Sequence, residues 1–472
     1  MAESSSTFIK KLIDFSVVTW ISFGLSFLTA PISTRLFIPE VLGKINIFNT
    51  YSNLFGILIM FGLDQAFARF YLERPNNRSK GYLFTFCFGT TYSLLLFFIV
   101  LSIPFGKVLS LVLFEEGDNL LLILFFFSVF CTSTLRYLNL SYRMEKNIKM
   151  YTIQGILITL VSKVLYLGVG FWDPSYKLAL IVLTISHVVL AVIFLGIQRN
   201  RFEFISVYDK GFTSEMLKFA IPLIPVSVLM WANTSIPQII MQKTMDYHSM
   251  GIFTSAVALA NVILVVQSGF NTFWVPYTYE NYKTQTGQFY KIHKYLIFVL
   301  TLCALILVLC QDVVFLLLGE KYREAKVFFP FLILGPVSYM IGETTGLGIN
   351  ISKRSYLNII VFGISVIFNI VLCLLLGALF GIPGIAISTA FAAIVAMILK
   401  TYFGEKYYVV IQSYKYMFFS ASFILVSALI TWKIPTMNIR ISLLVILFLA
   451  FMAFFRKEVI ELSKYALKFI RK

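Results

Sequence analysis

Apolar runs of about twenty residues recur along the whole chain, and no other sequence feature limits the fold so strongly. Each run is long enough to cross the ~30 Å hydrocarbon core of a bilayer as a helix. Inside hydrocarbon the backbone must satisfy its own hydrogen bonds, which leaves helices or closed barrels. The runs are continuous rather than alternating, so they predict helices. Charged residues make up 13% of the 472 residues, roughly half of the usual share in soluble domains, and no stretch long enough for a separate soluble domain lies between the runs.

We therefore predict an all-α polytopic membrane protein with about fourteen transmembrane helices. The first run is too long for the apolar core of a signal peptide and lacks an obvious small-residue cleavage site, so we interpret it as the first span. The predicted spans lie near residues 12–34, 45–72, 82–103, 119–142, 151–171, 177–197, 216–240, 251–276, 292–318, 327–349, 355–377, 382–402, 413–432 and 439–455. All five cysteines fall within apolar runs without metal-like spacing, which favours a packing role, and we expect no metal site and no cofactor.

The basic residues predict the orientation of these spans. With the N-terminus placed in the cytoplasm, 26 of the 39 Lys and Arg residues fall in cytoplasmic segments and 10 fall in the opposite loops. Cytoplasmic loops carry such an excess, so we expect both termini in the cytoplasm of a multi-pass bacterial inner membrane protein. Most of the net charge of +17 then faces anionic lipid head groups, and no nucleic-acid partner is expected.

Weak internal similarity predicts a parallel repeat of two six-helix lobes. A basic residue precedes a glycine by eight positions at Arg35–Gly43 and again at Lys243–Gly251, an offset of 208. Basic loops after spans 4 and 10 repeat at an offset of 207, at Lys146 and Lys353. The predicted divisions are an N-terminal lobe at 1–200, a C-terminal lobe at 201–405, and two extra helices with a basic cytoplasmic tail at 406–472. Parallel repeats in transporters place a substrate site between lobes that rock to give alternating access.

Ionisable residues inside spans are costly and suggest function. At 1.5 Å per helical residue, Lys163 lies roughly 20 Å from the cytoplasmic end of its span and Arg136 about 10 Å from its own. The three cations within spans of the first lobe predict a site for an anionic group such as a diphosphate: Lys163, Arg136 and Arg69. Residues predicted for coupling or gating are Asp64, Glu343 and His187. Purely structural roles are the alternative for these residues. Lys163 and Asp64 can neutralise each other as a buried pair, and Arg69 and Arg136 can extend to the membrane interface.

Polar and aromatic residues in spans 7 and 8 are candidates for contacts with sugars. Amides that could bind hydroxyls are Asn233, Gln238, Asn261, Gln267 and Asn271, and aromatic rings that could stack on sugar faces are Trp231, Trp274 and Tyr277. Interfacial anchoring or packing is the alternative role of these aromatic residues. Pro222, Pro225 and Pro237 favour kinks in span 7, since each removes a backbone hydrogen bond. We find no nucleotide-binding loop or nucleophile elbow and expect no enzymatic activity.

Several segments resemble the O-antigen and polysaccharide flippases of the multidrug/oligosaccharidyl-lipid/polysaccharide exporter superfamily. They are residues 34–43 (TRLFIPEVLG), 61–71 (FGLDQAFARFY), 251–255 (GIFTS), 273–276 (FWVP) and 381–389 (GIPGIAIST). The resemblance covers spans 1–12 and implies two six-helix lobes around a cationic cavity. It also implies flipping of an undecaprenyl-diphosphate-linked oligosaccharide, such as an O-antigen repeat unit of lipopolysaccharide, from the cytoplasmic to the periplasmic leaflet. Implied partners are this substrate, membrane lipids, H+ or Na+ as coupling ion, and the polysaccharide polymerase and chain-length machinery.

Three alternatives remain at this point. A multidrug cation antiporter of the same superfamily would favour carboxylates in its cavity, and a peptidoglycan lipid-precursor flippase would also carry a lipid diphosphate. A membrane polysaccharide polymerase or ligase would be expected to need a large outer loop for its acceptor, whereas no predicted outer loop exceeds about 16 residues.

Overall fold

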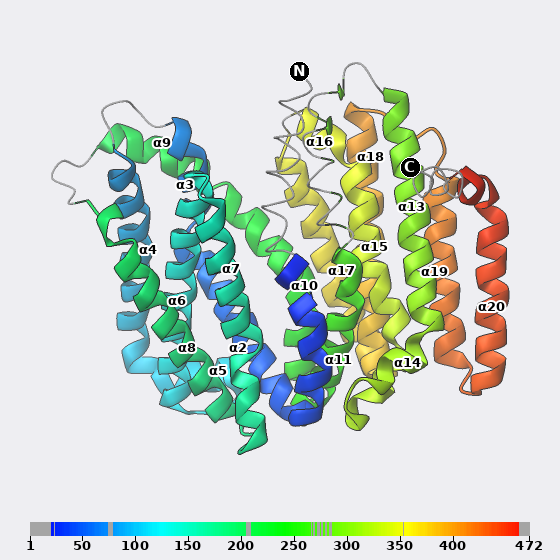
Figure 1. Cartoon of the computed structure of the whole chain (residues 1–472), viewed down its shortest axis with the longest axis horizontal. Helices are drawn as coiled ribbons and strands as arrows, with labels where there is room; N and C mark the ends of the chain where they lie inside the picture. Colours follow the sequence, from blue (N-terminus) through cyan, green and yellow to red (C-terminus); the bar gives the residue numbers. More distant parts are fainter. Residues whose placement is uncertain are drawn as a thin grey trace. The chain divides into compact units, whose positions relative to one another are not determined.

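The computed structural model describes residues 20–22, 24–73, 79–203, 209–265, 286–352 and 354–461, together with residues 267, 270, 274, 277, 278, 281 and 282. All elements in these ranges are helices (Figure 1). The all-α prediction is therefore confirmed. Two compact units divide the chain, Met1–Gly251 and Ile252–Lys472.

The long helices agree with most of the predicted spans. Ten helices are long and apolar enough to cross a membrane, and two further pairs, bent by 53° and 66°, bring the number to twelve. The predicted spans near 12–34 and 251–276 lie partly outside the described residues, so the count of fourteen stays a prediction. The helical segment that holds the third predicted span continues past residue 103 to Phe114, because the apolar run continues through a short 3-10 turn.

The first unit is a bundle built on α2, α4, α6, α7, α8 and α10 (Figure 1). Residues 20–36 are also helical, apart from residue 23, which is not described. Its labelled elements are α2 (Pro39–Met60), α3 (Leu63–Glu73), α4 (Lys80–Ser102), η1 (Ile103–Phe105), α5 (Gly106–Phe114), α6 (Asn119–Met144), α7 (Ile148–Lys163), η2 (Leu165–Phe171), α8 (Tyr176–Ile197), η3 (Arg199–Arg201), α9 (Lys210–Ala220) and α10 (Leu223–Thr244). Helix α11 (Tyr247–Ala260) begins in this unit.

The second predicted span is broken between α2 and α3. Phe61 and Gly62 both adopt positive φ angles, 53° and 72°, which end α2 and turn the chain by 53° into α3. Glycine is required at 62 for two reasons. A Cβ there would lie 2.5 Å from the carbonyl oxygen of Ala220, and any other residue would be strained by the positive φ angle. The break puts Asp64 in the first turn of α3, where the helix dipole favours a carboxylate.

The second unit contains the two labelled helices nearest the C-terminus, α19 and α20. Its labelled elements are η4 (Asn261–Ile263), α13 (Thr286–Leu309), α14 (Gln311–Leu316), η5 (Glu320–Val327), α15 (Phe329–Thr345), α16 (Leu347–Ile351), α17 (Tyr356–Phe380), α18 (Ile382–Tyr407), α19 (Lys415–Lys433) and α20 (Met437–Phe454). Helix α19 packs on α13 and α15, and α20 packs on α13 and α19 (Figure 1). Stacking of Phe298 on Phe451, with ring centroids 5.6 Å apart, is one of the contacts that make α20 part of this unit.

The repeated glycines meet in a reciprocal contact at one end of the first unit. A Cβ on Gly43 would lie 2.1 Å from the carbonyl oxygen of Tyr247, and a Cβ on Gly251 would lie 2.0 Å from that of Pro39. The same offset of 208 relates Pro39 to Tyr247 and Gly43 to Gly251, so the two contacts are equivalent under the repeat. The starts of α2 and α11 therefore cross backbone to backbone, as two elements related by a local two-fold axis would.

Helices α9 and α10 pack within the first unit, although the predicted boundary at 200 assigns them to the second lobe. The compact units and the predicted lobes are thus different divisions of the chain. The six-helix lobes stay a prediction.

Candidate functional site

A cavity of about 970 Å³ lies within the helices of the first unit. Its walls come from α2, α3, α6, α7, α8 and α10. The walls combine hydroxyl and amide groups with apolar side chains, and the charged residues of the lining are Asp64, Arg136 and Arg143. Two arginines and one carboxylate make the described lining cationic. Arg143 lies seven residues beyond Arg136 on α6, which separates them by about 10 Å along the helix, so the positive charge extends toward the predicted cytoplasmic end.

The central group of this cavity is an ion pair between α6 and the broken span. The Nε and Nη2 atoms of Arg136 donate to Oδ2 of Asp64 at 3.0 and 2.6 Å, and Nε2 of Gln65 donates to the same oxygen at 3.2 Å. The Asp64 side chain is nearly buried, whereas that of Arg136 is 52% exposed. Asp64 therefore holds one edge of a guanidinium that remains open to the cavity.

Other predicted site residues surround this pair. His187 is buried in α8 with Nε2 3.0 Å from the Ser162 hydroxyl, and it lines the cavity. Trp231 of α10 also lines the cavity and donates from its indole nitrogen to the carbonyl oxygen of Thr50 at 3.2 Å. Gln238 accepts a hydrogen bond from the Thr50 hydroxyl at 2.8 Å. The structure thus brings Asp64, Arg136, His187 and Trp231 to one cavity.

Three other predicted residues of the first unit lie outside the described cavity lining. Arg69 pairs with Glu73 one turn along α3 at 3.2 Å and covers the ring of Phe219 at 4.5 Å. Lys163 ends α7 with an exposed side chain, and it does not pair with Asp64, which binds Arg136 instead. Asn233 is partly buried on α10. The roles of these three residues stay predictions.

The second unit contains its own ion pair within a predicted span. Lys400 of α18 donates to Oε1 of Glu343 on α15 at 2.5 Å, and its ammonium lies 5.4 Å from the ring centroid of Tyr339. Tyr339 also lies within hydrogen-bonding reach of Glu343 and of Gln267. The structure therefore joins Glu343 and Gln267, two predicted residues, in one cluster.

Trp274 occupies a different environment from the open position expected for a sugar-stacking ring. It is 1% exposed, and Phe270 stacks on it at 5.1 Å while Phe289 meets it edge-on at 5.5 Å. In this state the ring is covered by its own aromatic cluster. A role in sugar binding would require this cluster to open.

Sequence reasoning missed two kinds of site residue. Lys400 lies seven residues before the end of α18, about 10 Å along the helix, so its depth was a signal that could have identified it. The small polar residues of the cavity wall gave no such signal, because serine and threonine are common in membrane helices as packing residues. These include Ser133, Ser227 and Ser235.

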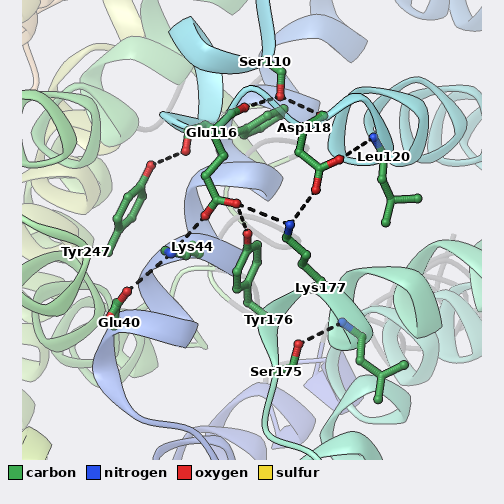
Figure 2. A network of polar contacts seen from close by, with 12 residues as sticks. Glu40, Lys44, Ser110, Glu116, Asp118, Leu120, Ser175, Tyr176, Lys177 and Tyr247 are labelled. Carbon is green, nitrogen blue, oxygen red and sulfur yellow. Dashed lines mark hydrogen bonds and ion pairs between the residues drawn. The ribbon is translucent and has the colours of Figure 1, made fainter. Parts of the chain in front are cut away.

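The end of the first unit that is predicted to face outward carries a second polar network (Figure 2). Glu116, in the loop between α5 and α6, pairs with Lys44 at 3.0 Å and accepts a hydrogen bond from Tyr176, while Asp118 pairs with Lys177 at 2.5 Å. Burial opposes ionisation of Glu116, but the hydrogen bonds from Tyr176 and Lys44 outweigh it and lower the pKa of this carboxyl. The hydrogen bond from Lys177 is the main cause that lowers the pKa of Asp118.

A family model and a known protein match this chain. A family model described as polysaccharide biosynthesis protein matches residues 8–282. The capsular polysaccharide biosynthesis protein CapF of Staphylococcus aureus is 22% identical over 279 residues, which are 56% of this chain and 69% of that protein.

Two solved structures share the fold at low identity. The lipid II flippase MurJ in an inward closed conformation has a TM-score of 0.70 at 14% identity and covers 95% of this chain and 100% of its own. An inward-facing multidrug resistance MATE family transporter of the MOP superfamily has a TM-score of 0.58 at 14% identity, covering 83% of this chain and 97% of its own. Because the family model matches more than half of the chain, this multi-pass membrane protein belongs to the polysaccharide biosynthesis protein family.

Proposed function

We propose that this protein flips an undecaprenyl-diphosphate-linked oligosaccharide from the cytoplasmic to the periplasmic leaflet of the bacterial plasma membrane. The observation that carries the proposal is the half-exposed guanidinium of Arg136 inside a polar cavity. Asp64 engages its Nε and Nη2 atoms. An arginine has five N–H donors, so donors remain for a phosphate, and a low-dielectric surrounding strengthens such charge-assisted bonds.

The sugar part of the substrate needs hydroxyl partners and flat apolar faces. Gln238, Asn139 and Ser227 supply polar groups in the same cavity, and the Trp231 ring supplies an aromatic face. Ligand sites combine apolar walls with a few convergent polar groups in this way. A cation and sugar-compatible walls in one cavity together support an anionic, sugar-bearing lipid as the substrate.

Transport is proposed to follow alternating access with both termini in the cytoplasm. Asp64, Glu343 and His187 are the residues proposed for coupling or gating, with an H+ or Na+ gradient as the energy source. Each acid of this set is bound to a cation of its own unit, Asp64 to Arg136 and Glu343 to Lys400. A substrate phosphate at Arg136 would weaken the first of these pairs, which links substrate binding to a carboxylate that can exchange a cation.

The charge of the cavity weighs against the cation-antiporter alternative, since two arginines and one carboxylate line its described part. A peptidoglycan precursor carries the same lipid diphosphate, so charge does not separate it from a surface polysaccharide. The relationship to a protein named for capsular polysaccharide biosynthesis supports the surface polysaccharide. We infer transport rather than catalysis, because all of these features concern binding.

The proposal is tested by measuring where undecaprenyl-diphosphate glycans accumulate in cells that carry Arg136→Gln. We expect build-up at the cytoplasmic leaflet and loss of surface polysaccharide, with normal amounts of protein in the membrane. The same glycan measurement identifies the oligosaccharide. Lys163→Gln in a parallel strain tests the second predicted cation.

Lys149→Gln is the matched control, since it removes one exposed positive charge from the same predicted side outside the cavity. We expect it to transport normally. Normal surface polysaccharide in Arg136→Gln, or increased sensitivity to cationic drugs with unchanged glycans in a deletion strain, would contradict the proposal.

A further inference from the structure

Hydrogen bonds join α10 to the elements α2 and α5 at the end of the cavity that is predicted to face outward. Nearest the cavity, Gln238 and Trp231 of α10 bind Thr50 of α2. One turn farther along α10, Gln242 accepts a hydrogen bond from the Tyr51 hydroxyl at 2.8 Å and donates to the carbonyl oxygen of Leu113 at 2.7 Å. These two layers lie between the cavity and the outer loops.

A third layer joins the ends of the helices. Lys243 donates to the carbonyl oxygen of Val112 at 3.0 Å and pairs with Glu115 at 3.2 Å. The Tyr247 hydroxyl donates to the carbonyl oxygen of Phe114 at 2.8 Å. All of these bonds go to the last residues of α5 and to Glu115, which follows it. Lys243 of α10 and Tyr247 of α11 therefore bind the same short segment.

A separate set of contacts holds the same loop to the remainder of the first unit. Ser110 lies 2.6 and 2.9 Å from the carbonyl oxygens of Glu116 and Asp118, which shapes the loop (Figure 2). Lys44 at the start of α2 and Lys177 at the start of α8 then bind its carboxylates. Glu116 and Asp118 thus anchor the loop on one side, while Glu115 and the preceding carbonyl groups face α10.

The glycine crossing allows these layers to form. Gly43 and Gly251 let the starts of α2 and α11 approach to a distance that any Cβ would block, since the nearest carbonyl oxygens would lie 2.1 and 2.0 Å away. Helix interiors prefer alanine to glycine by about 1 kcal/mol. The two glycines are therefore explained by the close approach rather than by helix formation.

We propose that residues 112–118 are a latch that closes the outer side of the cavity by binding Gln242, Lys243 and Tyr247, and that Lys44, Tyr176 and Lys177 keep the latch on its own lobe when it opens. Opening breaks the contacts to α10 and the glycine crossing and leaves the anchors intact. The inference rests on the proposed transport function for its role, but the second of the two tests below does not require the substrate to be known.

The first test compares two reversible tethers in a variant whose five native cysteines are replaced by alanine. A short bifunctional methanethiosulfonate joining Lys243→Cys to Glu115→Cys is expected to lock the latch and abolish transport, and a reducing agent is expected to restore it. The matched control joins Lys44→Cys to Glu116→Cys, a pair of similar length within the anchor, and is expected to leave transport intact. Transport through a locked 243–115 tether, or equal loss from both tethers, would overturn the latch.

The second test measures access to the cavity from outside without a transport assay. Thr234 is exposed to the cavity, so Thr234→Cys reports on opening through its labelling by an impermeant maleimide added to the outer side. Lys243→Glu replaces an attraction to Glu115 by a repulsion, and we expect labelling to rise roughly five- to thirty-fold. Gly43→Ala is expected to raise it as well. Lys433→Glu, which changes the predicted outer charge equally, should leave the rate unchanged.

Unchanged labelling in both Lys243→Glu and Gly43→Ala would overturn the latch whatever the substrate is. Increased labelling together with no detectable glycan transport by the parent protein would instead reject the proposed function and retain the latch. The two failures are therefore distinguishable.

Discussion

At the scale of single residues, Asp118 combines two roles that can be separated by substitution. Its side chain caps α6 by accepting a hydrogen bond from the backbone N–H of Leu120 at 2.9 Å, and it pairs with Lys177 at 2.5 Å. The bond from Lys177 is the first cause of its lowered pKa, and the bond from Leu120 is the second. A carboxyl whose pKa is lower in the folded state stabilises the fold above its unfolded pKa, and this stabilisation is lost as pH falls through the folded pKa.

We predict that Asp118→Asn lowers the melting temperature of the purified protein only slightly, because asparagine keeps the helix cap and a partly exposed ion pair contributes at most about 1 kcal/mol. The difference from the parent protein should be equal at about pH 7.5 and about pH 5.5, since both lie above the ordinary pKa of an aspartate. Asp118→Ala should lower the melting temperature further by removing the cap. A difference that disappears by about pH 5.5 would contradict the lowered pKa.

At the scale of helices, an ion triad attaches α20 to the second unit. Nη2 of Arg440, at the start of α20, lies 2.9 and 2.8 Å from the two carboxylate oxygens of Asp312, and Lys326 binds the same carboxylate at 2.8 Å. Burial opposes ionisation of Asp312, but the hydrogen bonds from Lys326 and Arg440 outweigh it and lower the pKa of this carboxyl. Asp312 therefore has two cationic partners, whereas the buried Arg440 has one carboxylate among the described residues.

This asymmetry predicts unequal effects for the two members of the pair. Asp312→Asn should destabilise the protein more than Arg440→Gln, because it leaves a buried guanidinium unpaired, and breaking buried pairs in this way costs about 3–5 kcal/mol. Arg440→Gln leaves Asp312 paired with Lys326. Thermal unfolding in detergent measures both, with the more exposed Lys326→Gln as a control of small effect. Equal melting temperatures for Asp312→Asn and Arg440→Gln would show that the triad is not arranged as described.

At the scale of the whole molecule, the basic residues predict which ends of the helices face the cytoplasm. Gly117 lies in the loop before α6 and Lys149 lies in the first turn of α7, so they belong to opposite ends of the first unit. In intact cells without native cysteines, we expect an impermeant maleimide to label Gly117→Cys but not Lys149→Cys. Permeabilised cells should label both. The reverse pattern would invert the predicted orientation and with it the direction of the proposed transport.

The membrane class and most of the spans followed from the sequence alone. Hydrocarbon thickness sets the length of an apolar helix whatever its neighbours are, so runs such as 355–377 and 382–402 correspond closely to α17 and α18. The sequence also marked Gly43 and Gly251 as equivalent positions of a repeat, because each follows a basic residue by eight positions at an offset of 208. The bend at Gly62 was missed, since an apolar run reads the same whether its helix is straight or broken.

Only the tertiary structure decided which of the buried charges meet. Counting residues from a helix end gives the depth of a side chain, but neither the direction in which it points nor the helix beside it. Depth alone allowed Asp64 to pair with Lys163, whereas the rotation of α6 presents Arg136 to it and Lys163 lies elsewhere. The same reason explains why Lys400 was missed as the partner of Glu343 and why Trp274 is covered by its own aromatic neighbours, because each of these contacts depends on which helices pack together.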